Sequence, residues 1–244
     1  MSWLRTFVPR PRPLLRLFCF PHAGGTAGAY RSWTGLLPPE VELVAVQYPG
    51  RHDRFGEPCV TSMEDLVAGA AADMRPLLDR PYALFGHSMG ATAAFETARA
   101  FQRAGLPAPV RLFASARAAP SRSRPVDVDT DSDAALLAHV RELGSAGGRH
   151  LDAEPRLRPV VLPALRGDLV VLNSYRFAGG PLRCPITALS GSADDNVPPE
   201  EIWAWQRHTT QPLHHVELPG GHFYLETATA ELVELVLRQV LAPV

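Results

Sequence analysis

The chain has 244 residues, of which 46% are hydrophobic and 20% are charged. This length and apolar content are sufficient for a large core, so we expect residues 1–244 to form one α/β domain. The formal net charge of −1 excludes a strong global field that would attract nucleic acid or an anionic membrane.

The three cysteines form no C-x-x-C pair. Cys19 and Cys184 lie in or beside apolar runs, so we interpret them as small core residues rather than as ligands or nucleophiles. No apolar stretch reaches the length of a transmembrane helix, and we identify no signal peptide. We therefore expect a cytoplasmic protein with reduced thiols, and we expect a monomer.

The N-terminal segment is rich in arginine and proline. Because Arg10, Arg12 and Arg16 lie among prolines, we expect residues 1–13 to form a loose arm and these arginines to be solvated. The first strand is expected at residues 14–20, where the apolar run LLRLFCF begins.

The turn PHAGG at residues 21–25 follows this strand. Its two adjacent glycines allow backbone N–H groups to point toward a neighbouring site. This position suits one donor of an oxyanion hole, although a plain strand-to-helix loop is the alternative. The next helix should carry Tyr30, Trp33 and Leu37.

The most informative motif is GHSMG at residues 86–90, which matches the pattern G-x-S-x-G. An apolar strand at 82–85 precedes it, and an alanine-rich helix at 91–103 follows it. In this context Ser88 lies on a sharp strand-to-helix turn that exposes its hydroxyl. A helix that starts at Met89 directs free N–H groups toward the space above that hydroxyl. A glycine-rich turn with an inactive serine is the alternative.

Strand-like apolar runs recur along the chain, at residues 14–20, 41–47, 82–85, 110–114, 184–190 and 213–218. Helical patterns alternate with them, and a closing amphipathic helix is expected at residues 231–241. Because the strands are apolar throughout, this alternation predicts a mainly parallel sheet with helices on both faces.

The alternation of strands and helices stops between residues 117 and 180. Two amphipathic helical patterns occur there, one of which includes Leu136 and Val140, and we find no strand pattern. We expect an inserted helical lid at about residues 121–180, which would form an apolar chamber over the sheet. An additional surface subdomain is the alternative.

An acyl-transfer site needs a nucleophile, a base and an acid, which follow one another as serine, acid and histidine in this fold. His222 follows the last predicted strand in a glycine-rich loop, which is the position expected of the base. Asp194 and Asp195 both follow the strand at 184–190. The spacing G-x-x-D-x-x-V favours Asp194 as the acid.

Five stretches of the chain match the motifs of one family: FPHAGG at 20–25, YPGR at 48–51, FGHSMG at 85–90, residues 168–175, and GGHF at 220–223. On these motifs the chain resembles the type II (editing) thioesterases of polyketide and nonribosomal peptide synthesis, which belong to the α/β-hydrolase superfamily. One departure is Asp195-Asn196, where relatives often have proline after the aspartate.

The resemblance implies that Ser88, Asp194 and His222 form the triad, and that the amides of Met89 and Ala23 form the oxyanion hole. It implies that the partners are acyl or peptidyl carrier protein domains, whose phosphopantetheine arm bears the acyl group. Hydrolysis by such a serine triad requires no metal and no organic cofactor, so we expect neither. Two alternatives remain, a small-molecule carboxylesterase with the same triad and a non-catalytic carrier-binding protein, which would be expected to lose a triad residue.

Overall fold

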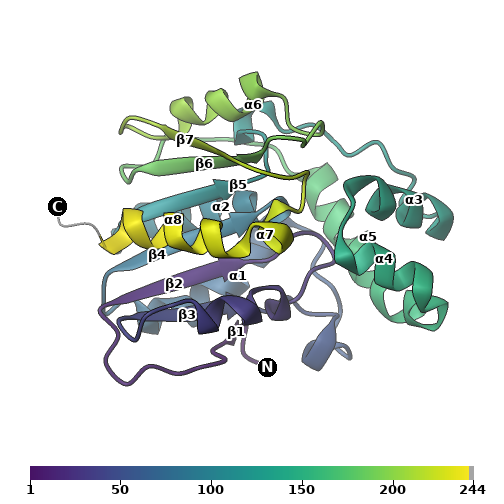
Figure 1. Ribbon diagram of the computed structural model, residues 1–244, viewed down its shortest axis with the longest axis horizontal. Coiled ribbons are helices and arrows are strands. Elements are labelled where there is room, and N and C mark those ends of the chain that lie inside the picture. Colours follow the sequence, from purple (N-terminus) through teal and green to yellow (C-terminus); the bar gives the residue numbers. More distant parts are fainter. Residues whose placement is uncertain (242–244) are drawn as a thin grey trace.

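A computed structural model describes residues 1–241, and a seven-stranded sheet runs through its centre (Figure 1). The strands are β1 (Leu4–Arg5), β2 (Leu15–Phe20), β3 (Val41–Val46), β4 (Tyr82–His87), β5 (Arg111–Ser115), β6 (Ile186–Gly191) and β7 (His214–Leu218). Their order in the sheet is β1-β3-β2-β4-β5-β6-β7. β1 pairs antiparallel with β3, and all the other neighbours are parallel. The predicted α/β class with a mainly parallel sheet is confirmed.

Helices cover both faces of this sheet, because its buried strands present apolar side chains on alternate sides. The α-helices are α1 (Met63–Met74), α2 (Met89–Arg103), α3 (Asp133–Leu143), α4 (Ala146–Ala153), α5 (Arg158–Ser174), α6 (Pro199–Trp203), α7 (Tyr224–Thr227) and α8 (Thr229–Leu241). Phe18 and Phe20 of β2 pack into the core beneath α1 and α2, whereas Leu17 and Cys19 pack into the core beneath α8. The strand therefore contributes to two separate cores.

The prediction of a loose N-terminal arm is wrong. β1 extends the sheet because the outer edge of β3 offers unpaired backbone groups, and the backbone N–H of Trp3 donates to Asp73 Oδ2 at 2.6 Å. The Trp3 ring fits against Gly69 of α1, where a Cβ atom would collide with it. Arg16 is not solvated either, because its guanidinium binds Glu42 Oε2 at 2.9 Å.

The helix predicted around Tyr30 and Trp33 is a 3₁₀-helix, η1 (Ala27–Gly35). A 3₁₀-helix has three residues per turn, so Ala27, Tyr30 and Trp33 lie on one side and are all buried. Leu37 lies beyond its end but is also buried. The predicted burial is therefore correct, whereas the predicted type of helix is not.

Helices α3, α4 and α5 lie together at one end of the sheet, between β5 and β6 in the sequence (Figure 1). The side chain of Ser132 caps α3, which ends at Gly144 with a φ of 75°. The sequence did not predict α4, because Gly147 and Gly148 lower its helix propensity. We call these three helices the lid helices.

Candidate active site

Ser88 occupies a strained turn between β4 and α2. Its φ of 53° and ψ of −119° lie in a region that non-glycine residues rarely adopt. A Cβ atom at Gly86 would collide with the carbonyl of Gly90, and a Cβ atom at Gly90 would collide with the carbonyl of Phe20. The backbone N–H of Ser88 donates to Ser115 O at 2.8 Å. The two glycines of the motif are therefore required by the close approach of neighbouring backbone.

His222 lies against Asp194. Its Nδ1 is 2.8 Å from Asp194 Oδ2, and the two side chains are 6% and 1% exposed. Burial acts to raise the pKa of Asp194, but hydrogen bonds from His222 and Asn196 outweigh it, so this pKa is lowered. Asp195 is exposed, and no hydrogen bond joins it to His222 in the described part of the chain. The ionised Asp194 carboxylate is thus placed to orient the His222 ring.

Two loops bring the acid and the histidine together. Asp194 follows β6 and His222 follows β7, and these strands are neighbours in the sheet. The backbone N–H of Ala193 donates to Gly220 O at 2.9 Å. Gly220 has a φ of 122°, which a side chain would strain. The glycines of this loop therefore serve the close contact between the two loops.

The two candidate oxyanion donors come from different segments of the chain, Met89 from the start of α2 and Ala23 from the turn after β2. Met89 is the first residue of α2, so its N–H has no acceptor within the helix. Ala23 lines the cavity, and its N–H has no acceptor within residues 1–241. The next amide, that of Gly24, donates instead to Asp168 Oδ2 at 2.7 Å. Ala23 and Met89 therefore offer amides that remain free for a ligand.

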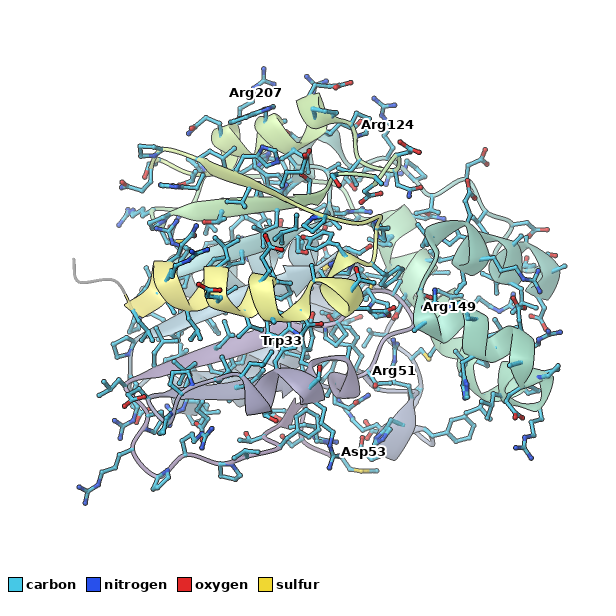
Figure 2. The ribbon with its side chains drawn as sticks, viewed as in Figure 1. Trp33, Arg51, Asp53, Arg124, Arg149 and Arg207 are labelled. Atoms are coloured by element: carbon cyan, nitrogen blue, oxygen red, sulfur yellow. The ribbon has the colours of Figure 1, made fainter. Side chains whose placement is uncertain are left out.

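Sequence reasoning did not assign a role to Asp168 or Arg51. Asp168 lies in α5 and is 0% exposed, and its Oδ1 accepts a hydrogen bond of 2.7 Å from Arg51 Nη2. Arg51 Nη1 also binds the Oδ2 atom that accepts from Gly24. Figure 2 shows Arg51 on the side of the molecule that faces the lid helices. Both residues belong to stretches that matched the family motifs, which was the only signal in the sequence.

A buried network of polar side chains lies next to His222. His87 Nδ1 lies 2.8 Å from Ser115 Oγ, and this oxygen lies 2.5 Å from the hydroxyl of Tyr224. The rings of His87 and His222 have centroids 5.4 Å apart. Burial lowers the pKa of His87, and the charge of a protonated His222 lowers it further. His87 is therefore neutral where it underlies the site.

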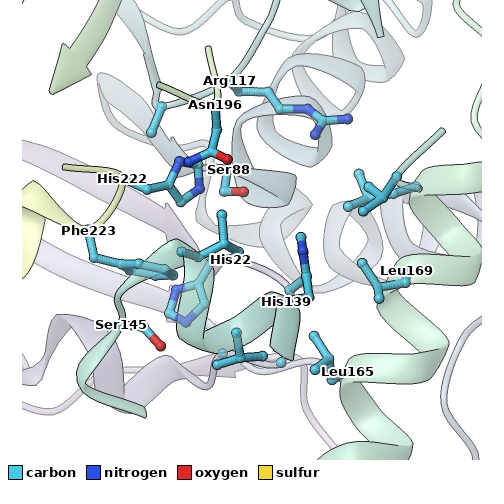
Figure 3. A pocket seen from close by; sticks show the side chains of 18 of the residues that line it. His22, Ser88, Arg117, His139, Ser145, Leu165, Leu169, Asn196, His222 and Phe223 are labelled. Carbon is cyan, nitrogen blue, oxygen red and sulfur yellow. The ribbon is translucent and has the colours of Figure 1, made fainter. Parts of the chain in front are cut away.

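A cavity of about 790 Å³ opens above Ser88 and His222, and the lid helices form much of its wall (Figure 3). Its apolar lining from these helices comprises Val140, Leu143, Leu151, Val161, Leu165, Leu169 and Leu172. Val140 thus lines the predicted chamber. Leu136, which belongs to the same apolar pattern, does not line the cavity but is 0% exposed in the core, although it lies only about one helical turn from Val140.

Within residues 1–241 no group of three or more His, Cys, Asp or Glu side chains is arranged to hold a metal ion. Among the same residues, no helix has the length and apolar character that crossing a membrane requires. Cys19 and Cys184 are free and buried, as expected of small core residues.

Known proteins resemble this chain along most of its length. A family model described as a thioesterase domain matches residues 15–240. Thioesterase PikA5 of Streptomyces venezuelae is 40% identical over 94% of this chain and 82% of its own length. Gramicidin S biosynthesis protein GrsT of Aneurinibacillus migulanus is 37% identical over 94% of this chain and 91% of its own length. The solved structure of the type II thioesterase BorB from the borrelidin biosynthetic cluster is 38% identical, with a TM-score of 0.90, and covers 98% of this chain and 99% of that one.

Proposed function

The chain belongs to the thioesterase family, and we propose that it is a free-standing editing enzyme that hydrolyses acyl groups from the phosphopantetheine arm of carrier proteins. It has the α/β-hydrolase fold of this family and is a hydrolase of thioesters. Two of its relatives are named for the gramicidin S and borrelidin pathways, which supports a role in polyketide or nonribosomal peptide synthesis.

One observation supports this proposal most strongly. The strained Ser88 and His222 border the same cavity, and His222 is hydrogen-bonded to Asp194. Met89, whose amide has no acceptor within α2, directly follows Ser88. Covalent acyl transfer needs a nucleophile, an oriented base and donors for the oxyanion within one site. We therefore assign Ser88 as nucleophile, His222 as base and Asp194 as the residue that orients it.

The reaction would proceed through an acyl-enzyme. His222 takes the proton of the Ser88 hydroxyl, and the oxygen attacks the thioester carbonyl. The amides of Met89 and Ala23 donate to the negative charge that develops on the carbonyl oxygen, and each donor contributes about 3 kcal/mol. The C–S bond breaks, and His222 returns the proton to the leaving pantetheine thiolate. A water molecule, deprotonated by His222, then releases the free acid and regenerates Ser88. Every step uses the chain's own residues.

The lid helices would hold the acyl chain and admit the arm. Val140 and Leu165 contribute apolar walls from α3 and α5, which suit the hydrocarbon part of an acyl group. Binding energy from the arm and the carrier domain can then be used to position the thioester over Ser88. The proposal includes a cytoplasmic, monomeric enzyme that meets carrier domains as its partners.

Mass spectrometry of an acyl-loaded carrier protein tests the proposal. The wild-type enzyme should release the acyl group and leave the free arm. Ser88→Ala should fold with an unchanged melting temperature and lose at least about a thousandfold in kcat, because the serine supplies the covalent step. A variant that retains a tenth of the wild-type kcat would show that the nucleophile is another residue.

Two outcomes would favour the alternative functions. If a simple ester of the same acyl group is hydrolysed as well as the carrier-bound thioester, the protein is a small-molecule carboxylesterase. If the wild-type protein binds the loaded carrier and releases no acid, it is a non-catalytic binding protein.

A further inference from the structure

Arg117 lines the cavity from the same side as the nucleophile (Figure 3). Strands β4 and β5 are neighbours, and His87 is paired with Ser115 in their register, so the residues that follow, Ser88 and Ala116, lie side by side. Ala116 has a φ of 49°, and its N–H donates to Leu189 O at 2.8 Å. The chain is thus turned sharply just before Arg117.

The backbone of Arg117 is fixed on its other side as well. Its carbonyl accepts a hydrogen bond of 2.8 Å from Trp205 Nε1, and the Trp205 ring is fully buried. Figure 3 shows the Arg117 side chain above Ser88, with Leu165 and Leu169 of α5 on the other side of the cavity. The backbone of Arg117 is therefore fixed on both sides, and its guanidinium is a cationic group at a cavity whose wall of lid helices is mostly apolar.

The hydrogen-bonding capacity of Arg117 is mostly unused. A guanidinium has five N–H donors. Arg117 Nη2 donates to Ser123 Oγ at 3.0 Å, whereas its Nε is buried and has no hydrogen-bond partner in the described part of the chain. No carboxylate within residues 1–241 forms an ion pair with it. Burial lowers its pKa more than the nearby Tyr175 and Glu201 raise it, so the surroundings do not compensate its charge fully.

Three arginines that are buried differ from the half-buried Arg117 in this respect. These are Arg51, Arg54 and Arg99, which are paired with Asp168, Glu57 and Glu96. Such pairing is the usual condition for placing a guanidinium away from water. Within residues 1–241 no carboxylate forms such a pair with Arg117, which borders the space where the acyl group would lie.

We propose that Arg117 is a specificity-determining residue that donates hydrogen bonds to an oxygen atom of the acyl chain. This inference rests on the proposed function. Because Arg117 follows the residue beside Ser88, the oxygen would lie within the first few carbons from the thioester carbonyl. Acyl groups with a hydroxyl, keto or carboxylate oxygen there would be preferred to unsubstituted alkyl groups. An alkyl chain would leave the donors of Arg117 unpaired when it displaces water from the cavity.

Four thioesters of the same chain length test this inference. Butanoyl, 3-hydroxybutanoyl, 3-oxobutanoyl and succinyl groups on pantetheine are compared by kcat/KM for the wild-type enzyme. We expect at least one oxygenated substrate to exceed butanoyl by about tenfold to a hundredfold, because hydrogen bonds to charged groups contribute more than neutral ones. In Arg117→Met this ratio should fall toward one. The matched control is Arg122→Met, which removes an exposed arginine from the rim of the same cavity and should keep the wild-type ratio.

The substrates also distinguish the kind of oxygen. A preference for succinyl that is lost in Arg117→Met identifies a carboxylate as the partner, and a preference for the hydroxyl or keto substrate identifies a neutral oxygen. Equal kcat/KM values in the wild-type enzyme would overturn the inference, as would a preference that survives in Arg117→Met. Equal values in the wild-type enzyme overturn the inference even if that variant does not fold. Failure of the wild-type enzyme to hydrolyse any of the four groups, both on pantetheine and on a carrier protein, would instead contradict the proposed function.

Discussion

The carboxylate of Asp168 in α5 and the guanidinium of Arg51, which follows β3, form a buried ion pair beside the loop that carries Ala23. Asp168 Oδ2 also accepts the N–H of Gly24 at 2.7 Å, so one carboxylate joins a lid helix to the residue next to a proposed oxyanion donor. An amide can stabilise an oxyanion only if it is held in place before the reaction. The pair therefore couples the position of α5 to the geometry of the active site.

The role of the Asp168–Arg51 pair is tested by variants that affect stability and catalysis differently. Asp168→Ala should lower the free energy of unfolding by about 3–5 kcal/mol, because Arg51 is left buried without a partner. The double variant Arg51→Met/Asp168→Leu should recover at least half of that loss. Its kcat should nevertheless stay at least tenfold below wild type, with KM changed less, since Gly24 has lost its acceptor. Thermal unfolding and steady-state kinetics on one thioester measure both quantities. A wild-type kcat in the double variant would show that the pair is only structural.

The neighbouring aspartates provide a matched comparison. Asp194→Asn should lower kcat by about a thousandfold or more, because an amide does not stabilise the imidazolium form of His222. Asp195→Asn changes the same chemical group at an exposed position and should keep kcat within about threefold. Kinetics at saturating thioester compare the two variants. The opposite ranking would assign the acid to Asp195.

Acid should destabilise the protein through His22. Burial, together with the charges of His222 and Arg51, lowers the pKa of His22 from 6.5 to about 4. The unfolded state therefore binds more protons than the folded state between these values, so stability falls as the pH decreases from about 6.5 to about 4. The expected loss is about 1–3 kcal/mol, since the ring also borders the cavity. Denaturant unfolding at several pH values should show that the His22→Phe variant loses less unfolding free energy over this pH range than the wild type does. An identical loss would show that His22 is not the cause.

Two positions on α3 distinguish the cavity wall from the core. Val140→Asp should fold, because Val140 borders the cavity, but it should lower kcat/KM at least tenfold by placing a charge in the acyl space. Leu136→Asp should lower the free energy of unfolding by about 4 kcal/mol or more, because Leu136 is fully buried. Circular dichroism during heating and thioester kinetics measure these effects. Equal loss of stability in both variants would mean that Val140 also belongs to the core.

The sequence by itself determined the features that depend on neighbouring residues. The turn around Ser88 could be predicted because the G-x-S-x-G motif lies between an apolar strand and an alanine-rich helix, and the alternation of strands and helices predicted the parallel sheet. His222 and Asp194 could be proposed because each follows a recognisable strand. Their contact, with 2.8 Å between Nδ1 and Oδ2, follows from the pairing of β6 with β7.

Only the tertiary structure decided which distant residues meet. The periodicity of α3 places Leu136 and Val140 on one apolar face, but it does not show which of them borders a cavity. The pairing of Asp168 with Arg51 joins residues 117 positions apart, and local patterns carry no information on such a contact. The free donors of Arg117 are likewise visible only when its surroundings are known. Burial and charge compensation depend on packing between elements, and this packing is a property of the folded chain as a whole.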